Sequence, residues 1–213
     1  MGYAEKIIQV DFKKKKIRTA PRKQGEGLVR SPLLGDVDSL RKNFSTATTE
    51  SEFRNRLVLE ILVRFGMRAS ELVILKKSDF ILDANGNHIL RYFRPKRNDF
   101  HTVKISVDAK DFLLSLIGAY HKTEIQDDHI FFSLPNHITK QRTKLTTRSL
   151  QRIVNDFGLV DGRGKSISPH SLRHYVGVRA SQEKDHSVGS KLLGNSLKVF
   201  TEYYSDPTEE ALT

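Results

Sequence analysis

The sequence predicts an α+β domain that is mostly helical and carries one small three-stranded antiparallel sheet. In several segments apolar residues recur every three or four positions, which is the spacing of a helix with one buried face. The pair Asn85-Gly86 lies between two apolar runs and is a strong signal for a β-hairpin. Strands and helices do not alternate along the chain, which argues against a parallel sheet.

The composition is that of a globular protein with an excess of positive charge. The 213 residues include 36 Lys or Arg and 25 Asp or Glu, so the formal net charge is +11. Such a charge favours nucleic acid first, although charge alone also fits a basic protein without a polyanionic partner. The sequence has no cysteine, no apolar run long enough to cross a bilayer and no visible signal peptide. We therefore expect a cytoplasmic protein that contacts no membrane.

Residues 1–34 are expected to form a basic arm or linker. Within them, residues 1–30 hold nine Lys or Arg and three acids, so nine minus three, or +6, of the net charge lies here. This segment includes four consecutive lysines, Lys13–Lys16, and shows little periodicity. It is either a flexible arm that follows a DNA backbone or a solvated tail, and residues 7–12 could pair as a short strand.

Helices in the first half of the folded part are predicted from caps and periodicity. Thr49-Glu50-Ser51-Glu52 has the form of a capping box, and Gly66 is placed to end the helix that follows. The predicted helices are one capped by Asp36 or Asp38 and ending at Phe44, the capping-box helix with apolar periodicity from Phe53 to Phe65, and a short helix over residues 72–76.

Three strands are predicted at residues 80–82, 88–93 and 102–106. The first two are joined by the Asn-Gly turn, and the basic turn Arg94–Asp99 joins the second to the third. Because these connections are short, neighbouring strands run antiparallel.

Helical periodicity returns after the sheet, and reactive side chains gather in the last of these helices. The expected helices are residues 108–120, a helix capped by Thr146 or Thr147 and ending at Phe157-Gly158, a helix opening after Pro169, a short helix capped by Asp185 and ended by Gly194, and residues 197–204.

The segment from Pro169 to Tyr204 carries groups suited to chemistry at a phosphate. His170 and Arg173 are three residues apart and share a face of the predicted helix. An imidazole that handles protons beside a fixed guanidinium suits a reaction at a phosphate group. Tyr203 and Tyr204 follow near the end of the sequence, and each phenol is a possible nucleophile.

Four segments in order carry a family resemblance. They are Gly66-Met67-Arg68-Ala69-Ser70-Glu71-Leu72, Lys96 between the second and third strands, His170-Ser171-Leu172-Arg173-His174, and Leu192-Leu193-Gly194-Asn195-Ser196 through Tyr204. Together they resemble the boxes of the tyrosine recombinases, the family of phage-type integrases and Xer-type recombinases. Each box alone is weak, but four in this order are specific. The resemblance implies that residues 35–213 form a tyrosine-recombinase-like catalytic domain.

The resemblance implies a mechanism that agrees with the residue chemistry. Tyr204 would attack a DNA phosphodiester and form a 3′-phosphotyrosyl link, and the planar forks of Arg68 and Arg173 would hold the non-bridging oxygens. His170 would assist proton removal or hydrogen-bond the phosphate, and Lys96 would protonate the leaving 5′-oxygen. Because the bond energy is kept in the phosphotyrosine, the mechanism implies neither ATP nor a metal nor any other cofactor.

Local chemistry offers other roles for several of these residues. On local grounds alone Arg68 would be a surface arginine paired with Glu71. We expect Glu71 to orient Arg68 or to close the helix packing, and not to take part in the chemistry. His174 is expected to make a structural hydrogen bond. Lys96 is the least specific assignment, because a basic hairpin tip often contacts only the DNA backbone.

Spacing selects Tyr204 over Tyr203 as the nucleophile. The family's distance from Leu193-Gly194 to its tyrosine ends at Tyr204. Adjacent helical residues point about 100° apart, so we expect only one tyrosine to face the arginines. Tyr203 is expected to pack beside Val199.

Asn195 departs from the family pattern, which has His at this position, or Trp in one branch. An amide can donate a hydrogen bond but cannot carry a proton charge, so we expect a weakened active site at Asn195. The sequence therefore predicts a site-specific DNA recombinase or integrase. A DNA-binding regulator with a degenerate site is the alternative, and a topoisomerase with the same chemistry is a third.

The expected partner is double-stranded DNA, on which further protomers assemble into a synaptic complex. A full recombinase carries a core-binding domain before its catalytic domain, and only about 35 residues stand in its place here. We expect that domain to be absent or truncated, and the chain to be a monomer in free solution.

Overall fold

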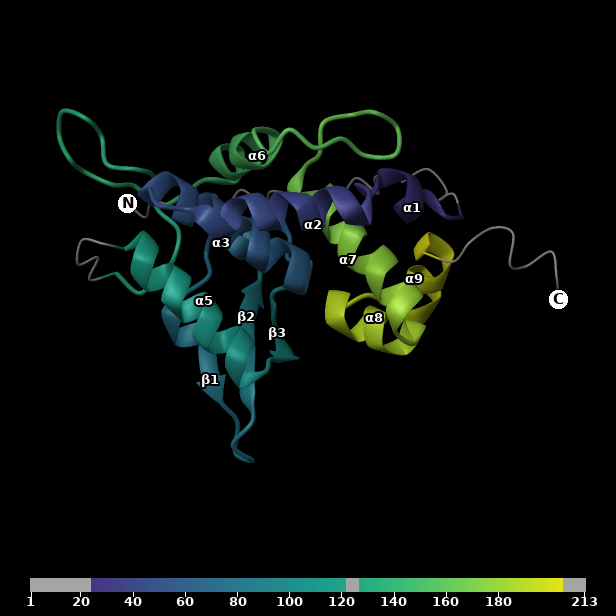
Figure 1. The fold of residues 1–213 in the computed structure, drawn as a ribbon. Coiled ribbons are helices and arrows are strands. Elements are labelled where there is room, and N and C mark those ends of the chain that lie inside the picture. The colour runs from purple at the N-terminus through teal and green to yellow at the C-terminus, as the bar shows by residue number, and fades with distance from the viewer. Residues whose placement is uncertain (1–23, 122–126, 205–213) are drawn as a thin grey trace, which may run out of the picture.

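Helix α3 (Glu50–Phe65) runs through the centre of the fold and contacts helices from both halves of the chain (Figure 1). The computed structural model describes residues 24–121 and 127–204. Between Leu57 and Val63 every side chain of α3 is buried, since α5 packs on one side and α7 on another. The hydrophobic core of the domain forms around this helix.

Both ends of α3 are set by local sequence, as predicted. The Thr49 hydroxyl accepts a hydrogen bond from the Glu52 N–H at 3.2 Å, and the Glu52 carboxylate accepts one from the Thr49 N–H at 2.9 Å. At the other end Gly66 takes a left-handed conformation with φ of 58°, which glycine adopts without steric cost. The capping box and the C-terminal glycine are therefore confirmed.

The part of the expected arm that the structure describes is packed on the domain. Residues Glu26–Arg30 form α1, which lies against α7 and α9. The Gly25 N–H donates a hydrogen bond to the Glu202 carbonyl oxygen at 3.1 Å and ties the start of α1 to α9. The lysine run and the possible strand at residues 7–12 lie outside the described residues.

Two predicted helices have different bounds in the structure. Helix α2 spans Leu34–Asn43 and is followed by a short 3-10 helix, so Asp36 lies in its first turn and the predicted aspartate cap was wrong. The helix predicted at residues 72–76 is instead α4, Ala69–Leu72. It starts earlier because the Glu71 carboxylate accepts a hydrogen bond from the Arg68 N–H at 2.8 Å and organises the first turn there.

The sheet has the predicted order, β1-β2-β3, with antiparallel neighbours. Its strands are β1 (Phe80–Leu82), β2 (His88–Arg94) and β3 (Asp99–Lys104). Strand β3 begins three residues before the expected start at residue 102, because Arg94 and Asp99 pair across the turn in the ladder and through their side chains.

The second half of the domain is helical. Its helices are α5 (Val107–Tyr120), α6 (Thr147–Asn155), α7 (Pro169–Glu183), α8 (His186–Leu193) and α9 (Leu197–Tyr204). The predicted caps Thr146 and Asp185 are confirmed, and Gly194 ends α8 with φ of 60°. Helices α7, α8 and α9 pack together beside α1, at the side of α3 away from α5 (Figure 1). None of the helices in the described part of the chain is long and apolar enough to cross a membrane.

Candidate active site

A polar cavity of about 210 Å³ opens where α4, the β2–β3 turn, α7 and α9 meet. Its lining includes every site residue that the sequence predicted, although these lie up to 136 positions apart (204 minus 68) in the chain. The lining residues are Arg68, Lys96, His170, Arg173, His174, Asn195, Val199, Tyr203 and Tyr204.

Arg68 is held at the edge of the cavity by a buried acid. Glu71, whose side chain is 1% exposed, accepts a hydrogen bond from Arg68 Nη1 at 2.7 Å and one from the Arg68 backbone N–H. One carboxylate thus starts α4 and also orients the guanidinium that precedes it. The expectation that Glu71 orients Arg68 is confirmed.

Arg173 is fixed from within the protein. Its guanidinium is buried and donates from Nη1 to the Gly66 carbonyl oxygen at 2.6 Å and from Nη2 to the Leu193 carbonyl oxygen. These two acceptors end α3 and α8, where helix dipoles favour a cation. Burial first, and then the charge of Arg68, lower the pKa of Arg173 to about 10, so it remains charged at neutral pH.

The two histidines of α7 are neutral at physiological pH. Their rings meet edge to face, with centroids 4.5 Å apart. His170 keeps part of its surface open to solvent, yet crowding by protein atoms and then the positive charge of Arg173 lower its pKa to about 4. His174 is 2% exposed, and burial lowers its pKa to about 3.

Tyr204 reaches the cavity from the end of α9 and is hydrogen-bonded there. Its hydroxyl lies 3.1 Å from His174 Nδ1. Burial raises the pKa of Tyr204 to about 12, and the positive charge of Arg173 opposes this rise. The phenol is therefore protonated at neutral pH and loses its proton only if a neighbouring group accepts it.

Tyr203 also lines the cavity. Its ring is stacked on His174, with centroids 5.8 Å apart and planes 3° apart. Both tyrosines therefore border the polar cavity. His174 connects them, because its ring stacks on Tyr203 and its Nδ1 is hydrogen-bonded to the Tyr204 hydroxyl. The expectation that only one of the two tyrosines faces the arginines stays a prediction.

Lys96 and Asn195 complete the cavity from two loops. Lys96 is an exposed residue in the β2–β3 turn. Asn195 follows α8, and its side-chain oxygen accepts a hydrogen bond from Arg173 Nη2 at 3.4 Å. The side-chain nitrogen of Asn195, Nδ2, makes no hydrogen bond to any residue in the described ranges and is available as a donor, whereas the backbone N–H donates to the Ser190 carbonyl oxygen.

The cavity is electropositive and continues toward α6. Arg68, Lys96 and Arg173 bring three cations to it, while Glu71 stands behind one of them. An adjoining depression of about 460 Å³ shares Arg68, Lys96 and His170 and extends to the N-terminal end of α6. In residues 24–121 and 127–204, no three metal-ligating side chains come together.

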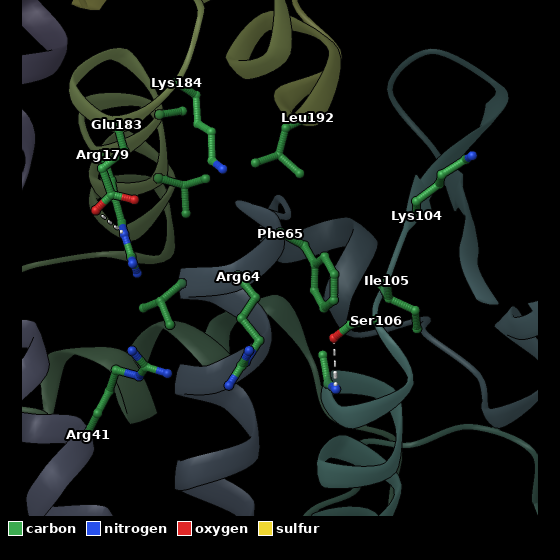
Figure 2. A pocket seen from close by; sticks show the side chains of 14 residues that line it. Arg41, Arg64, Phe65, Lys104, Ile105, Ser106, Arg179, Glu183, Lys184 and Leu192 are labelled. Carbon is green, nitrogen blue, oxygen red and sulfur yellow. Dashed lines mark hydrogen bonds and ion pairs between the residues drawn. The ribbon is translucent and has the colours of Figure 1, made fainter. Parts of the chain in front are cut away.

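A separate cavity of about 310 Å³ contains none of the predicted residues (Figure 2). It lies between α3, the C-terminal half of α7 and the β3–α5 junction, and both apolar and charged side chains line it. All three of its arginines are already paired: Arg41 and Arg64 donate to Glu60, and Arg179 donates to Glu183. The polar cavity is therefore the better candidate for chemistry at an anion.

Sequence reasoning did not assign His174 and Tyr203 to the site. His174 was expected to make a structural hydrogen bond, and the structure identifies its partner as the Tyr204 hydroxyl. The spacing between His170 and His174 was a usable signal, because residues four apart lie on one face of a helix. Nothing in the local sequence indicates the stacking of Tyr203.

Comparisons with known proteins agree with this geometry. The sequence model of the phage integrase family matches residues 35–211. Tyrosine recombinase XerH of Campylobacter jejuni is 27% identical over 189 residues, which cover 84% of this chain and 50% of that protein. Tyrosine recombinase XerA of Thermococcus kodakarensis is 29% identical over 160 residues, covering 75% and 53%. The chain thus spans about half the length of these curated relatives.

Solved structures share the fold. The XerH recombinase bound to its difH substrate superposes with a TM-score of 0.60 at 22% identity, covering 87% of this chain and 53% of that one. A lambda integrase dimer bound to a COC′ core site superposes with a TM-score of 0.54 at 19% identity, covering 80% and 59%. At these identities the likeness establishes the mostly helical fold with its small antiparallel sheet.

Proposed function

The chain belongs to the phage integrase family, and on this premise we propose that it cuts and rejoins DNA strands through a covalent 3′-phosphotyrosyl intermediate. One observation carries the proposal. A tyrosine hydroxyl, two fixed arginines, a neutral imidazole and a lysine all border one cavity of about 210 Å³. This is the set of groups that an in-line displacement at a phosphodiester requires.

In the proposed reaction, the Tyr204 oxygen attacks phosphorus and the bond to the 5′-oxygen breaks. Arg68 and Arg173 hold the non-bridging oxygens, whose negative charge increases in the transition state. Because Glu71 fixes the first guanidinium and backbone carbonyls fix the second, neither has to be ordered when DNA binds.

Proton transfers follow from the protonation states at neutral pH. His174 holds the phenol in place through its 3.1 Å hydrogen bond, and His170, beside it, accepts the phenolic proton or hydrogen-bonds the phosphate. Lys96 gives its proton to the leaving 5′-oxygen. Asn195 donates its amide N–H to a non-bridging oxygen, in place of the family's histidine.

We propose double-stranded DNA as the partner, bound along the cavity and the adjoining depression, in the cytoplasm. The three cations of the cavity and the net charge of +11 support this. We also propose that further protomers join on DNA, as in the DNA-bound dimer of lambda integrase.

Covalent trapping tests the proposal. A nicked suicide substrate loses the strand needed for religation, so the protein–DNA adduct accumulates and survives denaturation. We expect an adduct with wild type and with Tyr203→Phe, and none with Tyr204→Phe. If only Tyr203→Phe lost the adduct, the assignment of the nucleophile would be wrong. DNA binding without any wild-type adduct would instead favour a DNA-binding regulator with a degenerate site at Asn195.

A further inference from the structure

Arg94, which does not line the cavity, ties together two loops that do. It is 6% exposed and lies at the end of β2, just before the turn that carries Lys96. Its guanidinium holds Asp99 at the start of β3 with two hydrogen bonds, from Nε at 2.7 Å and from Nη2 at 2.6 Å. Two charge-assisted bonds in one plane fix both the distance and the orientation of the partners.

The backbone of Arg94 closes the same turn. Its carbonyl oxygen accepts hydrogen bonds from the Arg97 N–H at 3.0 Å and the Asn98 N–H at 2.9 Å, and Asn98 adopts a left-handed φ of 55°. Lys96 is exposed, and its side chain makes no ion pair within the described ranges. Only the backbone of this turn therefore limits where the ammonium group can reach.

The opposite edge of the Arg94 guanidinium, which carries Nη1, packs on the loop after α8. Arg94 Nη1 is buried and has no hydrogen-bond partner among the described residues. A Cβ added at Gly194 would overlap this nitrogen, so the guanidinium lies directly against the backbone that precedes Asn195. From β3, His101 Nε2 also contacts the Leu192 carbonyl oxygen at 3.0 Å.

We propose that Arg94 is a positioning residue for Lys96: braced against Gly194 and bonded to Asp99, it holds the β2–β3 turn so that the lysine reaches the leaving oxygen. This inference rests on the proposed function. In the step concerned, the bond from phosphorus to the Tyr204 oxygen forms as the bond to the 5′-oxygen breaks, and the phenolic proton passes to His170. One proton moves from Lys96 Nζ to that oxygen, leaving a neutral amine and a 5′-hydroxyl.

The choice of leaving group distinguishes a loss of proton donation by Lys96 from a general structural defect, because a structural defect slows cleavage whichever atom leaves. When sulfur replaces the bridging 5′-oxygen, the leaving thiolate is far less basic than an alkoxide and departs without a proton. Cleavage of this substrate does not need Lys96, whereas attack by Tyr204 and binding by the arginines are still required.

The experiment compares single-turnover adduct formation on oxygen and sulfur substrates. Asp99→Asn replaces one oxygen that accepts a hydrogen bond from Arg94 and removes the negative charge of Asp99, whose side chain is 45% exposed. Arg94→Lys keeps the positive charge but removes the planar guanidinium that makes both hydrogen bonds. We expect both variants to slow cleavage of the oxygen substrate by about tenfold or more, a fraction of what a general acid contributes, and to cleave the sulfur substrate at the wild-type rate. Thermal unfolding verifies that each variant is folded.

Three matched variants calibrate the result. Lys96→Ala is expected to show the same selective defect, only larger. Asn195 lies beside Gly194, but its proposed partner is a non-bridging oxygen of the phosphate, so Asn195→Ala should slow cleavage of both substrates. Arg97→Ala removes a cation from the same turn without altering the Arg94–Asp99 pair, and should leave the oxygen-to-sulfur rate ratio unchanged.

The outcomes separate this inference from the proposed function. If Asp99→Asn and Arg94→Lys slow both substrates equally, Arg94 has only a structural role and the inference is overturned. If the sulfur substrate does not restore the cleavage rate of Lys96→Ala, Lys96 is not the general acid. The inference about Arg94 is then wrong, while the proposed cleavage by Tyr204 stands. If wild type forms no adduct with either substrate, the proposed function itself fails.

Discussion

Burial determines the protonation of His174, the residue that holds the Tyr204 hydroxyl. The ring is 2% exposed, its Nδ1 bonds the phenol, and its Nε2 has no partner among the described residues. A protonated imidazolium would therefore be buried, with His170 and the cations Arg30 and Arg173 nearby, and the pKa of His174 falls to about 3. In the unfolded chain the same group has a pKa near 6.5.

This difference predicts a loss of stability in mild acid. Below about pH 6.5 the unfolded chain binds a proton at His174 that the folded protein refuses, so the stabilisation present above that pH is lost as the pH falls toward 3. We expect wild type to lose on the order of 2 kcal/mol more than His174→Gln between pH 7 and pH 4.5. Urea unfolding at both pH values measures this, and equal losses for the two proteins would contradict it.

At the scale of elements, two glycines form a slot for the Tyr204 ring. Gly177 lies on α7 and Gly27 on α1, and a Cβ added at either would overlap the ring of Tyr204. The three helices α1, α7 and α9 can therefore approach closely only because these positions lack a side chain. The slot places the phenol beside His174.

Alanine substitutions at two helical glycines should have opposite effects. Gly177→Ala inserts a methyl group where the Tyr204 ring lies, and overpacking of this kind costs about 1–3 kcal/mol. Gly118→Ala on α5 meets no atom within 4 Å, so its higher helix propensity should stabilise the protein by roughly 0.5–1 kcal/mol. Chemical denaturation measures both, and stabilisation by Gly177→Ala would show that the ring can move away.

For the whole molecule, the distribution of charge predicts how DNA binding responds to salt. The described cavity carries three cations, and the run Lys13–Lys16 lies in the segment that we proposed as an arm. Each lysine or arginine that neutralises a phosphate releases a counterion, so the logarithm of the association constant falls linearly with that of the salt concentration.

Replacement of Lys13, Lys14, Lys15 and Lys16 by alanine should reduce this dependence. If all four contact phosphates, the slope becomes shallower by about 3 to 4. Fluorescence anisotropy with a DNA duplex, at salt concentrations from about 50 to about 200 mM, measures this slope. An unchanged slope would identify the run as a solvated tail that does not touch DNA.

The sequence by itself determined the elements whose signals are local. The capping box at Thr49, the left-handed glycines at 66 and 194 and the Asn-Gly hairpin each depend on a few neighbouring residues, and they predicted α3, α8 and the first two strands. The resemblance of four segments to the boxes of a known family also selected six site residues, all of which line one cavity: Arg68, Lys96, His170, Arg173, Asn195 and Tyr204.

Tertiary structure alone decided the features that depend on contacts between distant segments. Glu71 moved the start of α4, and the Arg94–Asp99 pair lengthened β3. Helix α1 packed onto α9, although it lies in the segment that was predicted to be a basic arm or linker. The hydrogen bond between His174 and Tyr204 joins residues 30 positions apart, and the contact between Arg94 and Gly194 joins residues 100 apart (194 minus 94). Periodicity reports which face of an element is buried, but the partner that it meets depends on how all the elements pack together.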